Sequence, residues 1–318
     1  MLGAAAHSAQ QRQVVSCGCA SDMRRVCDLC AGAGAMFVAC SLSCLERHLA
    51  EQHGEDACAR ESSETRARIC LAELNRRLAG SRQRYHEHRQ QVMALALETT
   101  GPAAGPAGDI AIFGAGNGSD LDLPRLADSF REIHLVDLDA EALERARQEL
   151  PTGLRARVIP HAPVELSGFM SRLDEWGDSF PDDATLGRAA FAAARAIVAA
   201  LGRDFDVVLS TGALSQLIVP FHRAWLASSA SWERLDAAIV AVHLATLVLS
   251  TRAGGRGVMA FDVPSSKDPR PTALLGQLQL PGMASLVQEP RLTSPWSWDL
   301  GGAVQLVYGL TFRRSTNG

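Results

Sequence analysis

The sequence lacks the features that would place the protein in a membrane, outside the cell or on a DNA duplex. Its longest apolar run, Ala237–Leu249, is too short for a bilayer core, which takes about 20 residues to cross. The N-terminus has no basic segment followed by an apolar run, so we expect no signal peptide and a cytoplasmic protein. The net charge of -4 excludes the strongly basic surface of a dedicated duplex-binding protein.

Cysteine is absent after position 70, and all eight cysteines precede that point. A disulfide framework would require an oxidising compartment, of which the sequence gives no sign. Clustered thiols in a cytosolic protein indicate a metal site instead. Two pairs are spaced as Cys27-x2-Cys30 and Cys40-x3-Cys44, and His48 follows Cys44 at a spacing that shares one helix face. Zinc binds four nitrogen or sulfur ligands in a tetrahedron, so the segment predicts zinc.

Residues 17–58 resemble the small cross-braced two-zinc fingers of the HIT and MYND type. The segment Cys40-Ser-Leu-Ser-Cys44, followed by His48, carries the resemblance. It implies two structural zinc ions, with Cys58 as an alternative ligand, and an outer surface that docks a protein or peptide partner. The eight ligands that it implies are Cys17, Cys19, Cys27, Cys30, Cys40, Cys44, His48 and His53.

Composition divides the chain into four segments. We expect a flexible N-terminus over 1–16, a zinc-binding finger over 17–58, a helical connector over 59–100 and a larger domain over 101–318. In the larger domain short apolar runs alternate with amphipathic stretches, which predicts βα units on a parallel sheet. Strands are predicted at 110–113, 133–136, 155–160, 206–209, 257–262, 285–288 and 304–312. Helices are predicted at 123–129, 140–149, 164–173, 184–201, 215–227, 232–251 and 271–278.

A glycine-rich loop follows the first strand predicted in this domain. Its glycines, spaced G-x-G-x-G from Gly114 to Gly118, let the backbone turn sharply and approach a ligand. The next predicted strand leads into Asp137, and an acid at that tip can accept hydrogen bonds from both hydroxyls of a ribose. The two features predict a nucleoside-type cofactor. A dinucleotide fingerprint would need a glycine at Ser119, so the spacing disfavours NAD.

The G-x-G-x-G form resembles motif I of class I S-adenosylmethionine-dependent methyltransferases. Val136–Arg147 resembles the stretch that begins with their second-strand acid, and Phe205–Leu217 resembles their fourth strand with its following loop. The C-terminal LVYGLTFRR resembles their antiparallel last strand. The resemblance implies an α/β fold with a Rossmann-like sheet. It also implies a cofactor site in which Asp137 holds the ribose, Leu138 lies against the adenine and Ser210 lies near the sulfonium. The loop residues that it places along the methionine and ribose are Gly114, Ala115, Gly116, Asn117 and Gly118.

The sequence therefore predicts a methyltransferase that acts on a small molecule or peptide it does not identify. Gln216 and His222, after the fourth strand, are the catalytic candidates, because an amide can orient a polar acceptor and an imidazole can act as a general base.

Two alternatives remain open. One is a zinc-containing RNA methyltransferase, which the arginine-rich segment 66–89 favours. The mild net acidity and the missing Asn/Asp-Pro-Pro-aromatic motif argue against it. The other is a non-catalytic adaptor on a methyltransferase-like scaffold. Ile112 and the loop 161–165 suggest it, because the family often has an acidic residue at the first place and an aspartate in that loop.

Overall fold

The computed structural model describes residues 14–16, 25–26, 36–39, 63–98, 108–176, 180–224, 229–300 and 304–316. The chain divides into two compact units, Met1–Ser62 and Ser63–Gly318. In the first unit β3 (Met36–Ala39) pairs in parallel with β1 (Val14–Ser16) and antiparallel with β2 (Arg25–Val26). All eight predicted zinc ligands lie outside the described residues, so the zinc finger stays a prediction.

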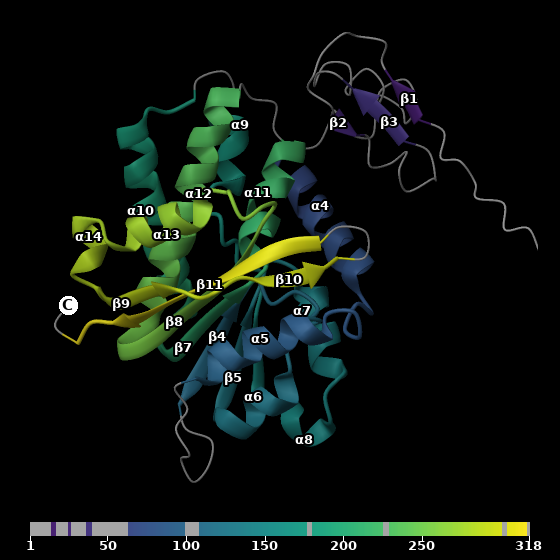
Figure 1. The fold of residues 1–318 in the computed structure, drawn as a ribbon, viewed down its shortest axis with the longest axis vertical. Coiled ribbons are helices and arrows are strands. Elements are labelled where there is room, and N and C mark those ends of the chain that lie inside the picture. The colour runs from purple at the N-terminus through teal and green to yellow at the C-terminus, as the bar shows by residue number, and fades with distance from the viewer. Residues whose placement is uncertain are drawn as a thin grey trace, which may run out of the picture. The chain divides into compact units, whose positions relative to one another are not determined.

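An eight-stranded sheet forms the centre of the second unit (Figure 1). Its order is β10-β11-β8-β7-β4-β5-β6, and β9 also pairs with β11. The pairs from β8 to β6 are parallel, whereas β11 runs antiparallel to β8. This order confirms the predicted Rossmann-like sheet with an antiparallel last strand. The strands are β4 (Asp109–Phe113), β5 (Glu132–Val136), β6 (Val158–His161), β7 (Phe205–Thr211), β8 (Thr251–Val263), β9 (Val287–Leu292), β10 (Trp296–Asp299) and β11 (Val304–Arg314).

Helices cover both faces of this sheet (Figure 1). Strand β4 shows why, because successive side chains of a strand point to opposite faces. Ile110 and Ile112 pack in one core with α5, α6 and α7, whereas Ala111 and Phe113 pack in the other with α10, α11, α12 and α13. The helices are α4 (Ser63–Leu78), α5 (His86–Leu97), α6 (Leu123–Ser129), α7 (Ala140–Gln148), α8 (Thr152–Arg155), α9 (Leu173–Trp176), α10 (Asp183–Leu201), α11 (Ala213–Ala224), α12 (Ser229–Ser250), α13 (Arg270–Leu278) and α14 (Pro281–Ala284).

The predicted helix at 164–173 is wrong. Val164–Phe169 is irregular, and only a short 3-10 turn, Met170–Arg172, precedes α9. The Glu165 carboxylate accepts a hydrogen bond from the Ser167 backbone N–H at 2.6 Å, and Gly168 follows with a φ of +75°. A side chain-to-backbone bond of this kind competes with helical bonding, and glycine permits the left-handed turn.

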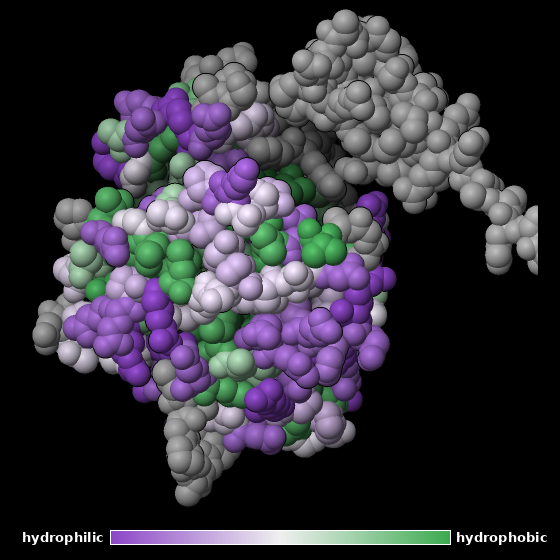
Figure 2. All heavy atoms as spheres, in the orientation of Figure 1, coloured by the Kyte–Doolittle hydropathy of each residue, from purple (hydrophilic) through white to green (hydrophobic). Residues whose placement is uncertain are grey.

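Helix α5 packs on the sheet through one side and faces solvent with the other. His88, Val92, Met93 and Ala96 are buried. Figure 2 shows a hydrophilic surface over one end of α5 and an apolar surface beside the other. The helices α4 and α5 belong to the same compact unit as the sheet.

Helix α10 is the one described helix that is long and apolar enough to cross a membrane by length and composition alone. Its buried residues Leu186, Ala190, Ala194 and Ile197 belong to the same core cluster as residues of α12. A helix with one side in the protein core passes such a length test without spanning a bilayer.

Candidate cofactor site

The carboxyl ends of β4, β5, β6 and β7 meet at one edge of the sheet, because these strands pair in parallel. Phe113 pairs with Val136 on one side and with Ser210 on the other. The glycine loop, Asp137 and the start of α11 therefore lie at the same edge. Ligands of open α/β sheets bind at this edge.

The glycine loop needs glycine at three positions. Gly114, Gly116 and Gly118 have φ angles of +70°, +48° and +65°, in the left-handed region that other residues rarely adopt. A Cβ atom on Gly114 would lie 2.6 Å from the Cβ of Ala213, the first residue of α11. Gly114 thus allows the loop to pack against the segment that follows β7.

Asp137 joins the glycine loop to the tip of β5. Its Oδ2 accepts a hydrogen bond from the Gly116 backbone N–H at 2.9 Å, and its Oδ1 accepts one from the Asp139 backbone N–H at 2.9 Å. Burial raises the pKa of this carboxyl above its ordinary value, and the two backbone donors oppose that rise. Each carboxylate oxygen can accept a second hydrogen bond, so the two backbone bonds leave Asp137 able to accept hydrogen bonds from the hydroxyls of a ribose.

A cavity of about 30 Å³ lies beside Asp137. Of the residues predicted for the site, Gly114, Asp137, Leu138 and Gln216 line it. The other lining residues come from α4, from the loop and 3-10 turn after β6, and from α11. They are Leu71, Val164, Glu165, Leu166, Met170, Ala213 and Leu217.

Glu165 is an acidic residue of the site that sequence reasoning missed. The family resemblance directed attention to an aspartate in the loop after β6, and the loop has Glu165 at its end instead. Burial raises the pKa of its carboxyl, and hydrogen bonds from Ser167 and from the Met170 backbone N–H oppose this.

Ser210 and Thr211, at the end of β7, have their hydroxyls engaged elsewhere. The Ser210 hydroxyl is fully buried and lies 2.8 Å from Nε2 of His243. The Thr211 hydroxyl donates to Asp120 Oδ2 at 2.8 Å. Asp120 comes directly after the glycine loop and was not predicted as a site residue. Burial raises the pKa of its carboxyl to about 6, within the range useful to a general base near neutral pH.

The remaining predicted residues divide between the loop and helix α11. Ala115 is buried, and the Asn117 side chain donates to the Asn75 carbonyl of α4 and accepts from Arg145 Nε at 3.1 Å. Gln216 lines the cavity. His222 belongs to α11, but its side chain lies outside what the structure describes.

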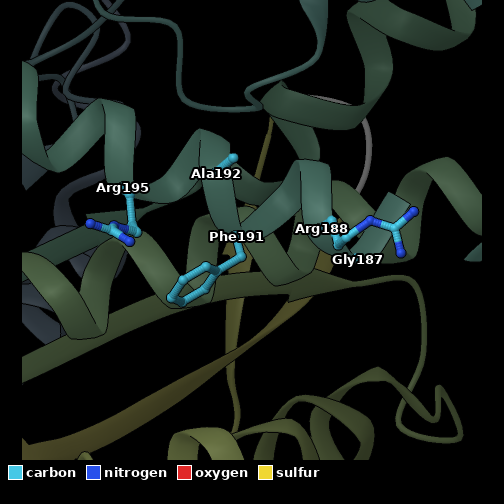
Figure 3. Close-up of a pocket in the computed structure, with 5 residues that line it drawn as sticks. All are labelled: Gly187, Arg188, Phe191, Ala192 and Arg195. Carbon is cyan, nitrogen blue, oxygen red and sulfur yellow. The ribbon is translucent and has the colours of Figure 1, made fainter. Parts of the chain in front are cut away.

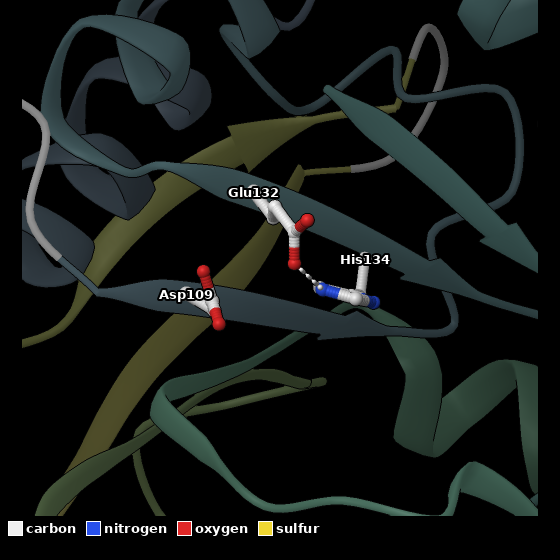
Figure 4. A group of neighbouring side chains, drawn as sticks. All are labelled: Asp109, Glu132 and His134. Atoms are coloured by element: carbon white, nitrogen blue, oxygen red, sulfur yellow. Dashed lines mark hydrogen bonds and ion pairs between the residues drawn. The ribbon is translucent and has the colours of Figure 1, made fainter. Parts of the chain in front are cut away.

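A second group of metal-binding residue types lies at the amino ends of β4 and β5 (Figure 4). Ligand atoms of Asp109, Glu132 and His134 lie within 4.8 Å of one another. Arg131 Nη2 donates to Asp109 at 2.8 Å, and Arg203 bonds to both carboxylates. Burial raises the pKa of Asp109, but hydrogen bonds from Arg131 hold it below its ordinary value overall. Two guanidinium groups already balance these charges, so we interpret the group as an ion-pair network.

A shallow groove on the outer side of α10 is also unlike a cofactor site (Figure 3). It is lined by Gly187, Arg188, Phe191, Ala192 and Arg195. All five residues come from a single helix, Phe191 is 56% exposed, and none of the predicted site residues lines the groove.

No family model and no curated protein matches the sequence. Among solved structures, the N-methyltransferase NodS from Bradyrhizobium japonicum WM9 is 13% identical over 78% of this chain and 98% of its own, with a TM-score of 0.44. The magnesium protoporphyrin IX methyltransferase ChlM from Synechocystis PCC 6803 is 13% identical over 81% and 99%, with a TM-score of 0.43. A TehB-like SAM-dependent methyltransferase from Corynebacterium glutamicum is 16% identical over 76% and 96%, with a TM-score of 0.39. These TM-scores are below 0.5, and the Rossmann-like sheet of this chain is defined by its own strand order with an antiparallel last strand.

Proposed function

We propose that this protein is an S-adenosylmethionine-dependent methyltransferase. One observation carries the proposal: the Gly116 backbone N–H donates to Asp137 Oδ2 at 2.9 Å, beside a cavity that Gly114, Asp137 and Leu138 line. This hydrogen bond places a glycine loop and an acidic residue next to each other at the carboxyl edge of a parallel sheet. Nucleoside-type cofactors bind to such an arrangement.

The residues at this edge fit the groups of the cofactor by their chemistry. Asp137 would accept hydrogen bonds from the ribose, Leu138 offers an apolar surface for the adenine, and the glycine loop admits a chain close to the backbone. The cofactor would supply a methyl group activated by a sulfonium. The protein then has to align the acceptor, for which Gln216 in the cavity wall is the candidate.

Replacing Asp137 by alanine should weaken binding of S-adenosylmethionine by about 100-fold or more, because two charge-assisted hydrogen bonds to the ribose are lost. We would titrate the purified protein calorimetrically with S-adenosylmethionine and, in parallel, with NADH. Asp137→Asn keeps the side-chain volume but removes the charge and replaces one of the two acceptor oxygens by an NH2 donor, so it should also weaken binding. Asp128→Ala, an exposed aspartate of α6, is the matched control and should bind as the wild type does.

Binding of S-adenosylmethionine alone, lost in Asp137→Ala, would support the proposal and justify a search for the acceptor. If neither ligand binds the wild-type protein, the proposal fails, and a non-catalytic adaptor becomes the better account of the fold. Unchanged binding in Asp137→Ala would show that the cofactor lies elsewhere.

We further propose that the Cys/His segment binds two structural zinc ions and docks a protein or peptide partner. Atomic emission should find two zinc ions per chain. Cys44→Ser should lower that number, because a thiolate ligand is lost. Gly116→Val should block the cofactor and leave the zinc content unchanged. A chain without zinc would contradict this part of the proposal and leave the cofactor site unaffected.

A further inference from the structure

Helix α4 closes one side of the cavity beside Asp137. It packs against α11, α7 and the 3-10 turn at Met170–Arg172. Leu71 of α4 lines the cavity together with Gly114 and Asp137. One turn further along, Asn75 is only 3% exposed, and its Oδ1 lies 3.1 Å from where a Cβ on Gly116 would stand. The helix therefore covers both the cavity and the central glycine of the loop.

Both the side chain and the backbone of Asn75 form hydrogen bonds that hold α4 against the site. Its Nδ2 donates to Asp139 Oδ2 at 3.0 Å, and its carbonyl accepts from the Asn117 side chain. Asp139 is the N-cap of α7 and accepts from the Ala142 backbone N–H at 3.0 Å. Through its side chain and its backbone carbonyl, Asn75 thus connects three elements of the site, namely α4, the glycine loop and the start of α7.

The cavity under α4 is too small for a nucleoside cofactor. It measures about 30 Å³, whereas pockets for ligands of that size measure about 300–1,000 Å³. One wall has to move before the cofactor can enter. Gly114 and Asp137 belong to the sheet edge and cannot move without disturbing strand ends.

Helix α4 shows few buried apolar side chains among those that the structure describes. Among its described side chains only Ala67 and Leu71 are buried and apolar. Elements with few buried apolar contacts open most readily, and lids are drawn from them. The polar contacts of Asn75 therefore add to the apolar contacts that hold α4 over the cavity.

We propose that α4 is the lid of the cofactor site and that Asn75 is the residue that latches it. The inference rests on the proposed function, because the proposed function assigns S-adenosylmethionine as the ligand that the lid admits. Opening breaks the bond from Asn75 to Asp139 and uncovers Gly116 and the cavity. Asn75 positions the lid in the ligand-free protein and does not itself bind the cofactor.

The latch can be tested in the full chain with Asn75→Ala and with Asn75→Asp, which keeps the side-chain size and sets a second negative charge against Asp139. Gln83→Ala, at an exposed position in the turn that follows the same helix, is the control. Hydrogen exchange of residues 63–78 without ligand should accelerate about 10-fold in both Asn75 variants and not in the control, the effect expected for one lost hydrogen bond to a charged group. The association rate constant and affinity for S-adenosylhomocysteine should rise by the same factor, because a larger share of molecules is open.

The other outcomes separate three statements, namely that α4 is a lid, that Asn75 latches it and that the site binds S-adenosylmethionine. If S-adenosylhomocysteine binds all variants at the wild-type rate and exchange in α4 is unchanged, the lid is overturned and the proposed function stands. If affinity falls in the Asn75 variants, Asn75 is a ligand-binding residue and not a latch. If no variant binds S-adenosylhomocysteine although exchange in α4 accelerates, the proposed function is overturned and the lid has no assigned ligand.

Discussion

Gly114→Ala is expected to lower the free energy of unfolding by about 3 kcal/mol and to abolish cofactor binding. Gly114 has a φ of +70°, where an L-residue costs roughly 1–2 kcal/mol. The new methyl group would also stand 2.6 Å from the Cβ of Ala213. Ala213 is 1% exposed and begins α11, so relief requires a backbone shift in the cavity wall, and overpacking of this kind costs about 1–3 kcal/mol. Urea denaturation and calorimetric titration with S-adenosylmethionine measure the two effects.

The same substitution at Gly187 should have the opposite sign. Gly187 lies within α10, and a Cβ there would meet no atom within 4 Å. Alanine is the better helix former, so Gly187→Ala should stabilise the protein by up to about 1 kcal/mol and leave binding unchanged. Equal stability of Gly114→Ala and the wild-type protein would refute the close contact between the glycine loop and α11.

The sheet could be predicted from the sequence because its central strands are buried on both faces. Ile110–Phe113 and Val207–Leu209 read as short apolar runs, the first between an aspartate and a glycine and the second directly after an aspartate. The short strand Trp296–Asp299 was missed because four residues with two tryptophans carry no clear alternation against their surroundings. The segment 164–173 was misread because its apolar spacing fits a helix, whereas the bond between Glu165 and Ser167 sets a turn.

The site was predictable only where local motifs define it. The glycine loop and Asp137 belong to two neighbouring βα units, and their spacing along the chain is informative. Asn75 lies 64 residues before its partner Asp139, and Ser210 lies 33 residues before His243. No spacing rule indicates such pairs, because tertiary packing of α4 and α12 brings them together. The contribution of α4 to the cavity is therefore known from the structure alone.

Stability should fall between about pH 6.5 and pH 4 through two buried histidines. Burial lowers the pKa of His88 to about 4 and that of His243 to about 4. In the unfolded chain a histidine binds its proton near pH 6.5. Between these values the unfolded state holds more protons, so the stability that these residues contribute is complete above pH 6.5 and is lost as the pH falls to about 4. The loss is on the order of 3 kcal/mol per histidine.

The double variant His88→Gln, His243→Gln should flatten this part of the stability profile. Glutamine can still accept the bond that Trp296 Nε1 donates to His88 at 3.1 Å, and it can still pair with the Ser210 hydroxyl. His86→Gln, at an exposed position of the same helix as His88, should leave the slope unchanged. Asp120 acts with the opposite sign, because the raised pKa of its carboxyl, about 6, makes the folded state bind the proton first. Asp120 is present in both the wild-type protein and the double variant. We would measure the free energy of unfolding of each by urea denaturation at pH 7 and at pH 4.5. The change between the two pH values in the wild-type protein, minus the same change in the double variant, isolates the histidines. An unchanged difference would mean that these two imidazoles are accessible to protons in the folded protein.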